Sequence, residues 1–430
     1  MAGPPSLRER RVREAGRNIG DLSLEPAMSN PQMPSLSACD VLVIGAGPAG
    51  SACAQMLARA GLDVVLADQH EFPRDKVCGD GLIPDAHRAL ERLGVQGEVL
   101  ARARASAQVG CVGPSGGRVE VPARLAVLPR RELDEILRRA ALAAGARWLA
   151  PAKFEAPLVD ADGRVAGARL ALPGGISQSV AAHWTVLATG AASGPLTAAG
   201  LCTRKAPSGI ALRGYVRHEA MAARGNGLEV VWHRALRRGY GWIFPCAAGV
   251  FNIGVGVTHD GDVNLRDLFD AFKRIHAPAR ELLEGGEPLG PFKGAPLRCS
   301  LEGARWSRPG LLVAGEAAGS TYQFTGEGIG KALETGMLAA QAIALGHDAG
   351  AEAQVGARYE AALDSLKPRF AAYELANRIN DHPWLADLLV WRARRSPSLV
   401  KRLSGVLEET HDPGRLVTAG GVLRLLLPLS

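Results

Sequence analysis

The sequence predicts an α/β protein, α+β overall, in which a parallel-sheet domain is followed by an antiparallel sheet and by C-terminal helices. Three observations predict it. A β-branched run at 40–44, a helical stretch at 48–60 and an apolar run at 64–67 form a strand–helix–strand unit. Runs of alternating polarity fill much of 209–294, which is typical of antiparallel strands. Beyond about residue 328 the spacing of apolar residues is mainly helical.

The remaining elements follow from local signals. Leu133, Ile136, Leu137 and Leu142 share one side of a helix predicted over 131–144. Hairpin turns are indicated at 160–163 and 173–175, where Asp, Gly and Pro gather, and a buried strand is indicated at 184–188. Antiparallel strands are expected at 210–218, 228–233, 240–244 and 251–257. A buried strand at 311–314 precedes a glycine-rich turn and a long helix from about Gly328.

Composition excludes several classes of protein. With 430 residues, 47% of them hydrophobic and 22% charged, the chain can bury a large core. Seven scattered cysteines form no C-x-x-C pair, which predicts free thiols, no metal site and a reducing, cytoplasmic compartment. No apolar run reaches the roughly 18 residues that a membrane-spanning helix needs. No nucleic-acid recognition motif is present, so no nucleic-acid partner is expected.

The formal net charge of +7 is unevenly placed. Residues 391–430 carry seven Arg or Lys against three acidic residues. Two interpretations stay open: a solvated helix face, or a basic surface that contacts an anionic membrane or a diphosphate. In the second case the protein is peripheral to the inner face of the membrane.

A glycine motif identifies a dinucleotide site. Gly45, Gly47 and Gly50 form G-x-G-x-x-G, with Pro48 and Ala49 between the last two, directly after a strand and at the start of a helix. Gly45 permits the tight turn, Gly47 allows a pyrophosphate to approach, and Gly50 lets helix and strand pack closely, as in a Rossmann-like fold. Asp68, 18 residues beyond Gly50, ends the second strand, where a carboxylate accepts from ribose hydroxyls.

Four ordered segments between residues 39 and 345 resemble one family. The segment after the acid, Phe72-Pro-Arg-Asp-Lys76-Val-Cys78-Gly79-Asp-Gly81, is similar to the signature of the geranylgeranyl reductase family, whose fold is the p-hydroxybenzoate-hydroxylase type that binds FAD. Three later segments fit the same resemblance: Arg130-Arg-Glu-Leu-Asp134, Tyr240-Gly-Trp242-Ile-Phe244-Pro245, and Gly315-Glu316-Ala-Ala-Gly319 followed by Thr325-Gly-Glu-Gly328-Ile329.

The resemblance implies FAD as cofactor and assigns roles to residues. Gly315, Gly328 and Ile329 supply backbone N–H groups to the cofactor, and Glu316, at a position where Asp is commoner, accepts from ribityl hydroxyls. Thr189-Gly190 stands where related flavoproteins often have Asp-Gly. Arg130 either contacts FAD or only caps its helix. Lys76, Arg74 and Gly79 belong to the loop that the resemblance places beside the isoalloxazine; the alternative for Lys76 and Arg74 is that they are solvated surface charges.

The catalytic candidates are Cys78, Tyr240, Trp242 and Phe244. Cys78 is a proton donor or a shaper of the pocket near the flavin, or else a packing thiol. The three aromatic residues alternate along a strand and therefore project from one face, as a wall over flavin and substrate or as an ordinary core.

The residue patterns and the resemblance together predict domain limits. The proline-punctuated stretch 1–38 is expected to be a disordered N-terminal extension, 209–294 a substrate and catalytic sheet domain, and 346–430 a C-terminal helical region. The FAD-binding domain is expected to be discontinuous, at 39–208 and 295–345. The implied activity is reduction of C=C bonds in a prenyl or other long apolar substrate by hydride from reduced flavin, with NADPH, NADH or ferredoxin as electron donor. No second glycine motif marks a nicotinamide site.

Other activities fit the same fold less well. A flavin monooxygenase or halogenase acting on an aromatic or polyketide-like substrate is the main alternative. Halogenases of this superfamily usually show W-x-W-x-I-P, where this chain has Tyr240, Trp242 and Phe244 followed by Pro245. A prenyl-binding escort without a cofactor is disfavoured by the intact glycine motif. A quinone reductase of the electron-transfer-flavoprotein type needs a cysteine-ligated cluster, for which the ligands are missing.

Overall fold

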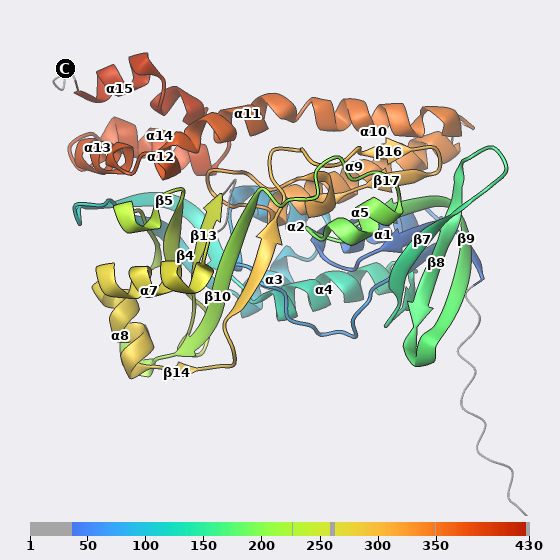
Figure 1. The fold of residues 1–430 in the computed structure, drawn as a ribbon, viewed down its shortest axis with the longest axis horizontal. Helices are drawn as coiled ribbons and strands as arrows, with labels where there is room; N and C mark the ends of the chain where they lie inside the picture. The colour runs from blue at the N-terminus through green and yellow to red at the C-terminus, as the bar shows by residue number, and fades with distance from the viewer. Residues whose placement is uncertain (1–36, 226, 259–262, 349, 427–430) are drawn as a thin grey trace, which may run out of the picture. The chain divides into compact units, whose positions relative to one another are not determined.

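The computed structural model describes residues 37–225, 227–258, 263–348 and 350–426 and contains two sheets with helices around them (Figure 1). The predicted fold class is confirmed, with one parallel-strand sheet and one largely antiparallel sheet. The expectation of disorder for 1–38 lies outside the described residues, apart from the last two. Both sheets belong to one compact unit, so the proposed domain limits stay a prediction.

The first sheet has a parallel centre, in which β1 lies between β2 and β9, because the apolar run at 41–44 is buried on both faces. Antiparallel hairpins extend it through β7 and β8. Its strands are β1 (Ala38–Ile44), β2 (Val64–Ala67), β6 (Arg147–Leu149), β7 (Lys153–Val159), β8 (Val165–Leu172), β9 (Ile176–Leu187), β16 (Ser307–Arg308) and β17 (Leu311–Val313).

Three helices pack together beside this sheet: α1 (Pro48–Arg59), α4 (Arg130–Ala143) and α9 (Ile329–Asp348). Small residues permit the close approach. A Cβ on Gly336 of α9 would lie 2.1 Å from the carbonyl oxygen of Ala49 in α1. The predicted strand–helix–strand unit and the predicted helices near 131 and 328 are therefore confirmed.

The second sheet is antiparallel except where β11 runs parallel to β4. The predicted antiparallel strands after 209 are confirmed, and the sheet also recruits three strands from the earlier part of the chain, which the proposed limits place in the FAD-binding domain. Its strands are β3 (Gly81–Leu82), β4 (Arg104–Val112), β5 (Arg118–Val127), β10 (Gly209–Arg217), β11 (Leu228–Val231), β12 (Gly239–Pro245), β13 (Val250–Thr258), β14 (Glu287–Pro288) and β15 (Lys293–Leu297).

Helices cover both faces of the second sheet. Phe251, Ile253 and Val255 of β13 point to one face and bury against α7 (Leu265–Ile275) and α8 (Ala277–Gly285). The opposite face packs against α13 (Trp384–Ala393) and α14 (Pro397–Leu407), which Figure 1 shows gathered over β4 and β5. This second layer leaves room for a cavity between sheet and helices.

The other helices complete the fold. They are α2 (Pro84–Arg92), α3 (Gln96–Arg102), α5 (Ser193–Ala198), α6 (Glu219–Ala223), α10 (Val355–Asp364), α11 (Lys367–Ala376), α12 (Arg378–Asp381) and α15 (Ala419–Leu426), with short 3₁₀ turns η1 (Pro173–Gly175), η2 (Arg234–Leu236), η3 (Gly315–Ala318), η4 (Glu352–Gln354) and η5 (Pro413–Leu416). Within the described ranges no helix is long and apolar enough to cross a membrane.

Candidate functional site

One cavity of about 820 Å³ joins the two sheets. It begins at Gly45 and Asp68 on the first sheet, passes the loop that contains Cys78, and ends among apolar side chains between the second sheet and the C-terminal helices. Every site residue expected from the sequence lines this cavity except Gly50, which packs beneath its wall. The roles of these residues stay predictions, but the fold brings them to one place.

The first end of the cavity is the turn between β1 and α1. Gly45 has φ +103°, and a Cβ there would lie 2.3 Å from the carbonyl oxygen of Ala188, so only glycine fits. A Cβ on Gly50 would lie 1.8 Å from the carbonyl oxygen of Gly45, which explains the close packing of helix and strand. The Asp68 side chain is 4% exposed, and its Oδ2 accepts a hydrogen bond from the Ala46 N–H at 2.8 Å.

The residues at this end suit a diphosphate. No side chain caps the N-terminus of α1, although Gly47, Pro48 and Ala49 line the cavity, so the first-turn N–H groups of the helix face a possible anion. Three cationic residues, Arg74, Lys76 and Arg130, line the same cavity. An uncapped helix N-terminus beside cations is the donor set that the diphosphate of FAD requires.

Arg130 is held in place by its own helix. Its guanidinium makes two hydrogen bonds to Asp134, at 2.7 and 2.8 Å, and the residue is 6% exposed. Burial alone would lower the pKa of Arg130, but the Asp134 carboxylate outweighs that effect and raises it. Arg74 Nη1 lies 3.0 Å from the same carboxylate. Arg130 therefore lines the cavity with its guanidinium fixed by Asp134, and its contact with FAD stays a prediction.

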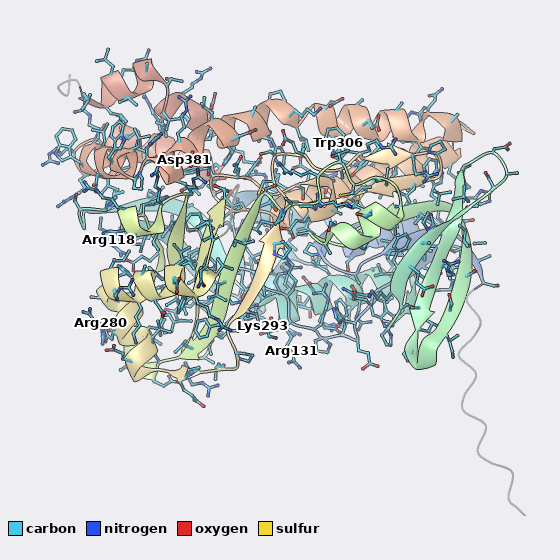
Figure 2. All side chains as sticks on the ribbon, in the orientation of Figure 1. Arg118, Arg131, Arg280, Lys293, Trp306 and Asp381 are labelled. Atoms are coloured by element: carbon cyan, nitrogen blue, oxygen red, sulfur yellow. The ribbon has the colours of Figure 1, made fainter. Side chains whose placement is uncertain are left out.

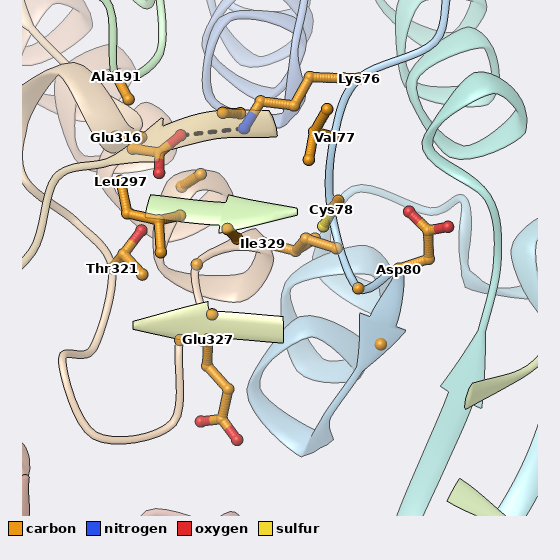
Figure 3. Close-up of a pocket in the computed structure, with 18 of the residues that line it drawn as sticks. Lys76, Val77, Cys78, Asp80, Ala191, Leu297, Glu316, Thr321, Glu327 and Ile329 are labelled. Atoms are coloured by element: carbon orange, nitrogen blue, oxygen red, sulfur yellow. Dashed lines mark hydrogen bonds and ion pairs between the residues drawn. The ribbon is translucent and has the colours of Figure 1, made fainter. Parts of the chain in front are cut away.

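An ion pair closes the opposite side of the cavity. Lys76 Nζ lies 3.1 Å from Glu316 Oε2, as Figure 3 shows by a dashed line, and joins the loop after β2 to η3. The Gly315 N–H donates to Thr335 Oγ1 of α9 at 2.9 Å, which fixes the turn. Glu316 is one methylene longer than the commoner Asp, and its carboxylate is paired with Lys76, a residue from another segment. Gly190, Gly328 and Ile329 line the wall nearby.

Three aromatic rings form a row along β12. Ring centroids of Tyr240 and Trp242 are 6.2 Å apart, and those of Trp242 and Phe244 are 6.4 Å apart. Gly254 stands opposite Trp242 on β13, and a Cβ there would lie 2.3 Å from the indole ring. Glycine on the neighbouring strand therefore makes room for the indole, and all three rings line the cavity.

The loop that carries Cys78 rests on this row. A Cβ on Gly79 would lie 3.4 Å from the Phe244 ring and 3.6 Å from the Trp242 indole nitrogen. Figure 3 shows the side chains of Cys78 and Asp80 on opposite sides of the loop. Both residues line the cavity, and Asp80 is fully buried with φ +64°.

Polar residues that sequence reasoning missed hold this loop from behind. Asn252 Nδ2 donates to the Cys78 carbonyl and to Asp80 Oδ2, both at 2.8 Å, and Asn252 Oδ1 accepts from the Trp242 indole at 2.9 Å. Tyr215 also donates to Asp80 Oδ2. Burial raises the pKa of Asp80 to about 6, against the opposing charge of Arg213. The signal available in the sequence was a lone Asn inside the apolar run of β13.

Arg213 anchors the front part of the same loop. This residue is 2% exposed, and its Nη2 donates to the Lys76 carbonyl and to Asp75 Oδ1, both at 2.8 Å. Lys293, labelled in Figure 2, donates to the other Asp75 oxygen at 3.0 Å. The second sheet therefore sets the position of the Cys78 loop, which the sequence places 135 residues before Arg213.

The far end of the cavity is apolar. Side chains from the second sheet face side chains from the C-terminal helices across it. The sequence did not single out the helix residues, because their pattern indicated only helix. The facing side chains are Val109, Val119, Val121, Leu125, Leu228 and Val230 on the sheet and Ile379, Ala386, Leu389, Val390, Leu403, Val406, Leu407 and Leu416 on the helices and on η5. Such a wall fits a long hydrocarbon chain.

Known proteins resemble this chain over most of its length. A family model described as an FAD binding domain matches residues 38–232. The menaquinone reductase of Mycolicibacterium smegmatis is 34% identical over 71% of this chain and 76% of that protein. Digeranylgeranylglycerophospholipid reductase 1 of Methanopyrus kandleri is 31% identical over 70% of this chain and 79% of that protein.

A solved structure shows the same fold. A geranylgeranyl bacteriochlorophyll reductase-like protein of Thermoplasma acidophilum superposes with a TM-score of 0.68 at 22% identity, over 91% of this chain and 96% of that chain. At this identity the likeness concerns the fold alone.

Proposed function

Because this chain belongs to the geranylgeranyl reductase family of FAD-dependent oxidoreductases, we propose that it saturates C=C bonds in the prenyl chain of a membrane lipid or quinone. The observation that carries the proposal is one cavity that runs from the uncapped N-terminus of α1 to an apolar wall. The names of the relatives favour reduction over the oxygen chemistry that the same fold supports elsewhere.

The cofactor-binding residues act by fixing position. Gly45, Gly47 and the N-terminus of α1 hold the diphosphate, with Arg130 as counter-charge, and Asp68 accepts from ribose hydroxyls. Lys76 orients Glu316 toward the ribityl side, and Gly190, Gly315, Gly328 and Ile329 shape the wall near the ring. FAD, when bound, supplies the hydride that the reduction needs.

The aromatic row prepares the place where substrate reacts. Tyr240, Trp242 and Phe244 exclude water, and their ring faces stabilise positive charge that develops on carbon during reduction of an isolated double bond. Cys78 lies across from this row and sets the width of the cavity. The apolar far end accepts the rest of the substrate's prenyl chain, so that its successive double bonds can reach the flavin ring in turn.

The experiment that tests the proposal is anaerobic turnover. The protein, loaded with FAD and photoreduced, is mixed with menaquinone or geranylgeranyl diphosphate, and the product is analysed by mass spectrometry. We expect a gain of two hydrogens per reduced double bond together with reoxidation of the flavin absorption band. Reoxidation by oxygen only, with hydroxylation or halogenation of an aromatic compound, would overturn the proposal.

The electron donor is proposed to be NADPH, NADH or ferredoxin. The glycine motif at residues 45–50 belongs to the FAD diphosphate, so a nicotinamide donor has to react at the cavity without a Rossmann motif of its own. Anaerobic mixing with each donor in turn distinguishes them, because the physiological donor bleaches the flavin band within the time of one turnover, whereas the others act more slowly.

We further propose that the protein docks on the membrane through its C-terminal helices. Eight large hydrophobic side chains are exposed among the described residues, and four of them lie here: Trp384, Trp391, Leu423 and Leu426. Exposed cations accompany them, and Arg395 lies 4.9 Å from the centre of the Trp391 ring. Exposed tryptophan beside basic residues suits the interface of an anionic bilayer.

Vesicle co-sedimentation tests this docking. The wild type should bind vesicles that contain anionic lipid more strongly than neutral ones, and the double variant Trp384→Ala/Trp391→Ala should lose most of that binding. Leu289→Ala, at an exposed position before β15, is the matched control. Equal sedimentation of all three proteins would contradict the docking surface.

A further inference from the structure

A buried carboxyl group lies at the cavity wall and has no part in the site described so far. Glu327 belongs to the loop between η3 and α9 and lines the cavity. Its Oε2 is shielded from solvent and has no hydrogen-bond partner among the described residues. Figure 3 shows its side chain extending away from the Lys76–Glu316 ion pair. Burying an ionised carboxylate without a partner costs free energy, so burial favours the protonated form. A protonated carboxyl at the cavity wall could take part in the reaction.

An ionic cluster lies behind Glu327. The Lys331 ammonium is 2% exposed and lies 2.8 Å from Glu409 Oε1, 3.5 Å from Asp85 Oδ2 and 2.5 Å from Glu334 Oε2. The Asp85 carboxyl rests against Gly330, in the first turn of α9, where a Cβ would lie 2.2 Å from it. Asp85 Oδ1, like Glu327 Oε2, lacks a hydrogen-bond partner within the described ranges.

The cluster extends from the buried first turn of α9, next to the cavity-lining Ile329, to the surface. The side chains of Asp85 and Glu409 are each 5% exposed, whereas that of Glu334 is 29% exposed. Glu409 continues outward to Arg88 and Arg369, each at 3.1 Å, and their side chains are 50% and 42% exposed. The cluster therefore runs from the buried Asp85 and Lys331 side chains to side chains that reach solvent.

The surroundings of Glu327 favour its neutral form. Burial, followed by the negative charges of Asp85 and Glu409, raises the pKa of Glu327 well above the ordinary value, and a hydrogen bond from Thr325 and the positive charge of Lys331 oppose them only in part. Burial likewise raises the pKa of Asp85 to about 6. Burial raises the pKa values of Tyr240 in β12 and Tyr373 in α11, and a negative charge on Glu327 would raise them further. These surroundings favour the neutral form of the Glu327 carboxyl beside the cavity.

We propose that Glu327 is the general acid that protonates substrate carbon, and that Asp85, Lys331 and Glu334 return a proton to it from the surface. The inference rests on the proposed function, since it concerns the same reaction. As the π bond breaks, a hydride from reduced FAD forms one C–H bond and the Glu327 proton forms the other. The alkene gains two electrons, FAD loses two, and Glu327 becomes a carboxylate that the relay neutralises.

The competing donor is Cys78, which lines the cavity on the opposite loop. The carboxyl on its own loop, Asp80, is fully buried and is held by Tyr215 and Asn252, whereas the Lys331 cluster includes Glu334, whose side chain is 29% exposed, and so leads to solvent. A donor that must be recharged after each double bond needs a path to solvent, because the cavity excludes water. For this reason the geometry favours Glu327.

Infrared spectroscopy and single-turnover kinetics test the proposal together. Glu327→Gln keeps the size of the side chain and removes the proton, Glu327→Asp restores a carboxyl, and Glu287→Gln, whose side chain is 69% exposed, is the matched control. In FAD-loaded protein without substrate, we expect a protonated-carboxyl C=O band at neutral pH that Glu327→Gln loses and Glu287→Gln retains. In single turnover Glu327→Gln should be at least about 100-fold slower, and Glu327→Asp should recover part of the rate.

The outcomes separate the two proposals. If the wild type reduces no prenyl substrate, the proposed function fails, whatever the infrared band shows. If the wild type does reduce it and Glu327→Gln reacts at the same rate, or the band is unchanged, the general-acid role is overturned while the function stands. If Cys78→Ser alone slows turnover, the thiol is the donor. Should Glu327→Gln fail to bind FAD, the band and rate of Glu327→Asp decide the question.

Discussion

His87 of α2 shows how burial changes the acid–base chemistry of a side chain. The residue is 2% exposed, and neither ring nitrogen has a hydrogen-bond partner among the described residues. Burial, with a smaller contribution from the positive charge of Arg124, lowers its pKa to about 4. Unfolded histidine titrates near 6.5, so the folded protein binds this proton less readily than the unfolded chain does.

This difference predicts a stability that depends on pH. The contribution of neutral His87 is fully present above about pH 6.5 and is lost as the pH falls toward 4, since only the unfolded state takes up the proton. His87→Leu removes the titrating group. Between pH 7.5 and pH 4.5 the free energy of unfolding should therefore fall less in this variant than in the wild type, by on the order of 2 kcal/mol. Urea unfolding at both pH values measures this.

The control for this experiment is His347→Leu, at an exposed position near the end of α9. The control should follow the wild type at both pH values. The buried-histidine account is wrong if His87→Leu and the wild type lose the same free energy of unfolding on acidification.

At the scale of elements, the segment between β2 and β3 is positioned by strands far from it in sequence. Asn252 of β13 joins the Cys78 carbonyl, Asp80 and the Trp242 indole through three hydrogen bonds of 2.8 to 2.9 Å. The residue is fully buried, so each of these groups depends on protein partners rather than on water.

Replacing Asn252 should therefore loosen the loop. Asn252→Ala leaves buried groups unpaired and should lower the free energy of unfolding by about 2–3 kcal/mol. Because the indole and Cys78 both shift, the visible spectrum of bound FAD and the quenching of its fluorescence should change as well. Asn264→Ala removes only a helix cap at the surface and should leave the flavin spectrum intact. An unchanged spectrum in Asn252→Ala would refute the positioning role.

The turn between β1 and α1 leaves no room for a side chain at Gly50. A Cβ on Gly50 would lie 1.8 Å from the carbonyl oxygen of Gly45, a backbone atom that cannot move without displacing the diphosphate-binding turn. Gly50→Ala should therefore lose FAD binding, measured as the flavin content after purification and reconstitution. Gly61→Ala, where no atom lies within 4 Å but φ is positive, should cost some stability and keep the flavin. Full flavin content in Gly50→Ala would contradict this packing.

At the scale of the molecule, the cavity exists because the C-terminal helices cover one face of the second sheet. Val390 of α13 is 4% exposed and lines the far end, well beyond the residues expected to hold FAD. The depth of the cavity, and hence the length of hydrocarbon that it accepts, is set by side chains from these helices.

Filling the far end should change substrate preference by chain length. Val390→Phe should raise the KM for long prenyl substrates by about tenfold, since roughly 1–2 kcal/mol of apolar contact is lost, and short ones should be affected little. FAD affinity should not change. Val159→Phe, at an exposed position on β7, is the control. Equal effects on long and short substrates would show that the prenyl chain of the substrate does not occupy the far end of the cavity.

The sequence by itself determined the nucleotide-binding half of the protein. The order of strand, glycine turn, helix and strand, the acid at Asp68 and the aromatic alternation at 240–244 are local patterns whose geometry follows from backbone sterics and strand periodicity. They led to the fold class, which the structure confirms, and to residues that share one cavity.

Only the tertiary structure decided how distant segments meet. The pairing of β11 with β4, the contacts of Arg213 and Asn252 with the Cys78 loop, and the ionic cluster of Asp85, Lys331 and Glu409 join residues more than 75 positions apart. No local pattern encodes such contacts, because burial and charge pairing depend on which surfaces the whole chain brings together. A single polar residue in an apolar strand has no visible partner until the fold supplies one.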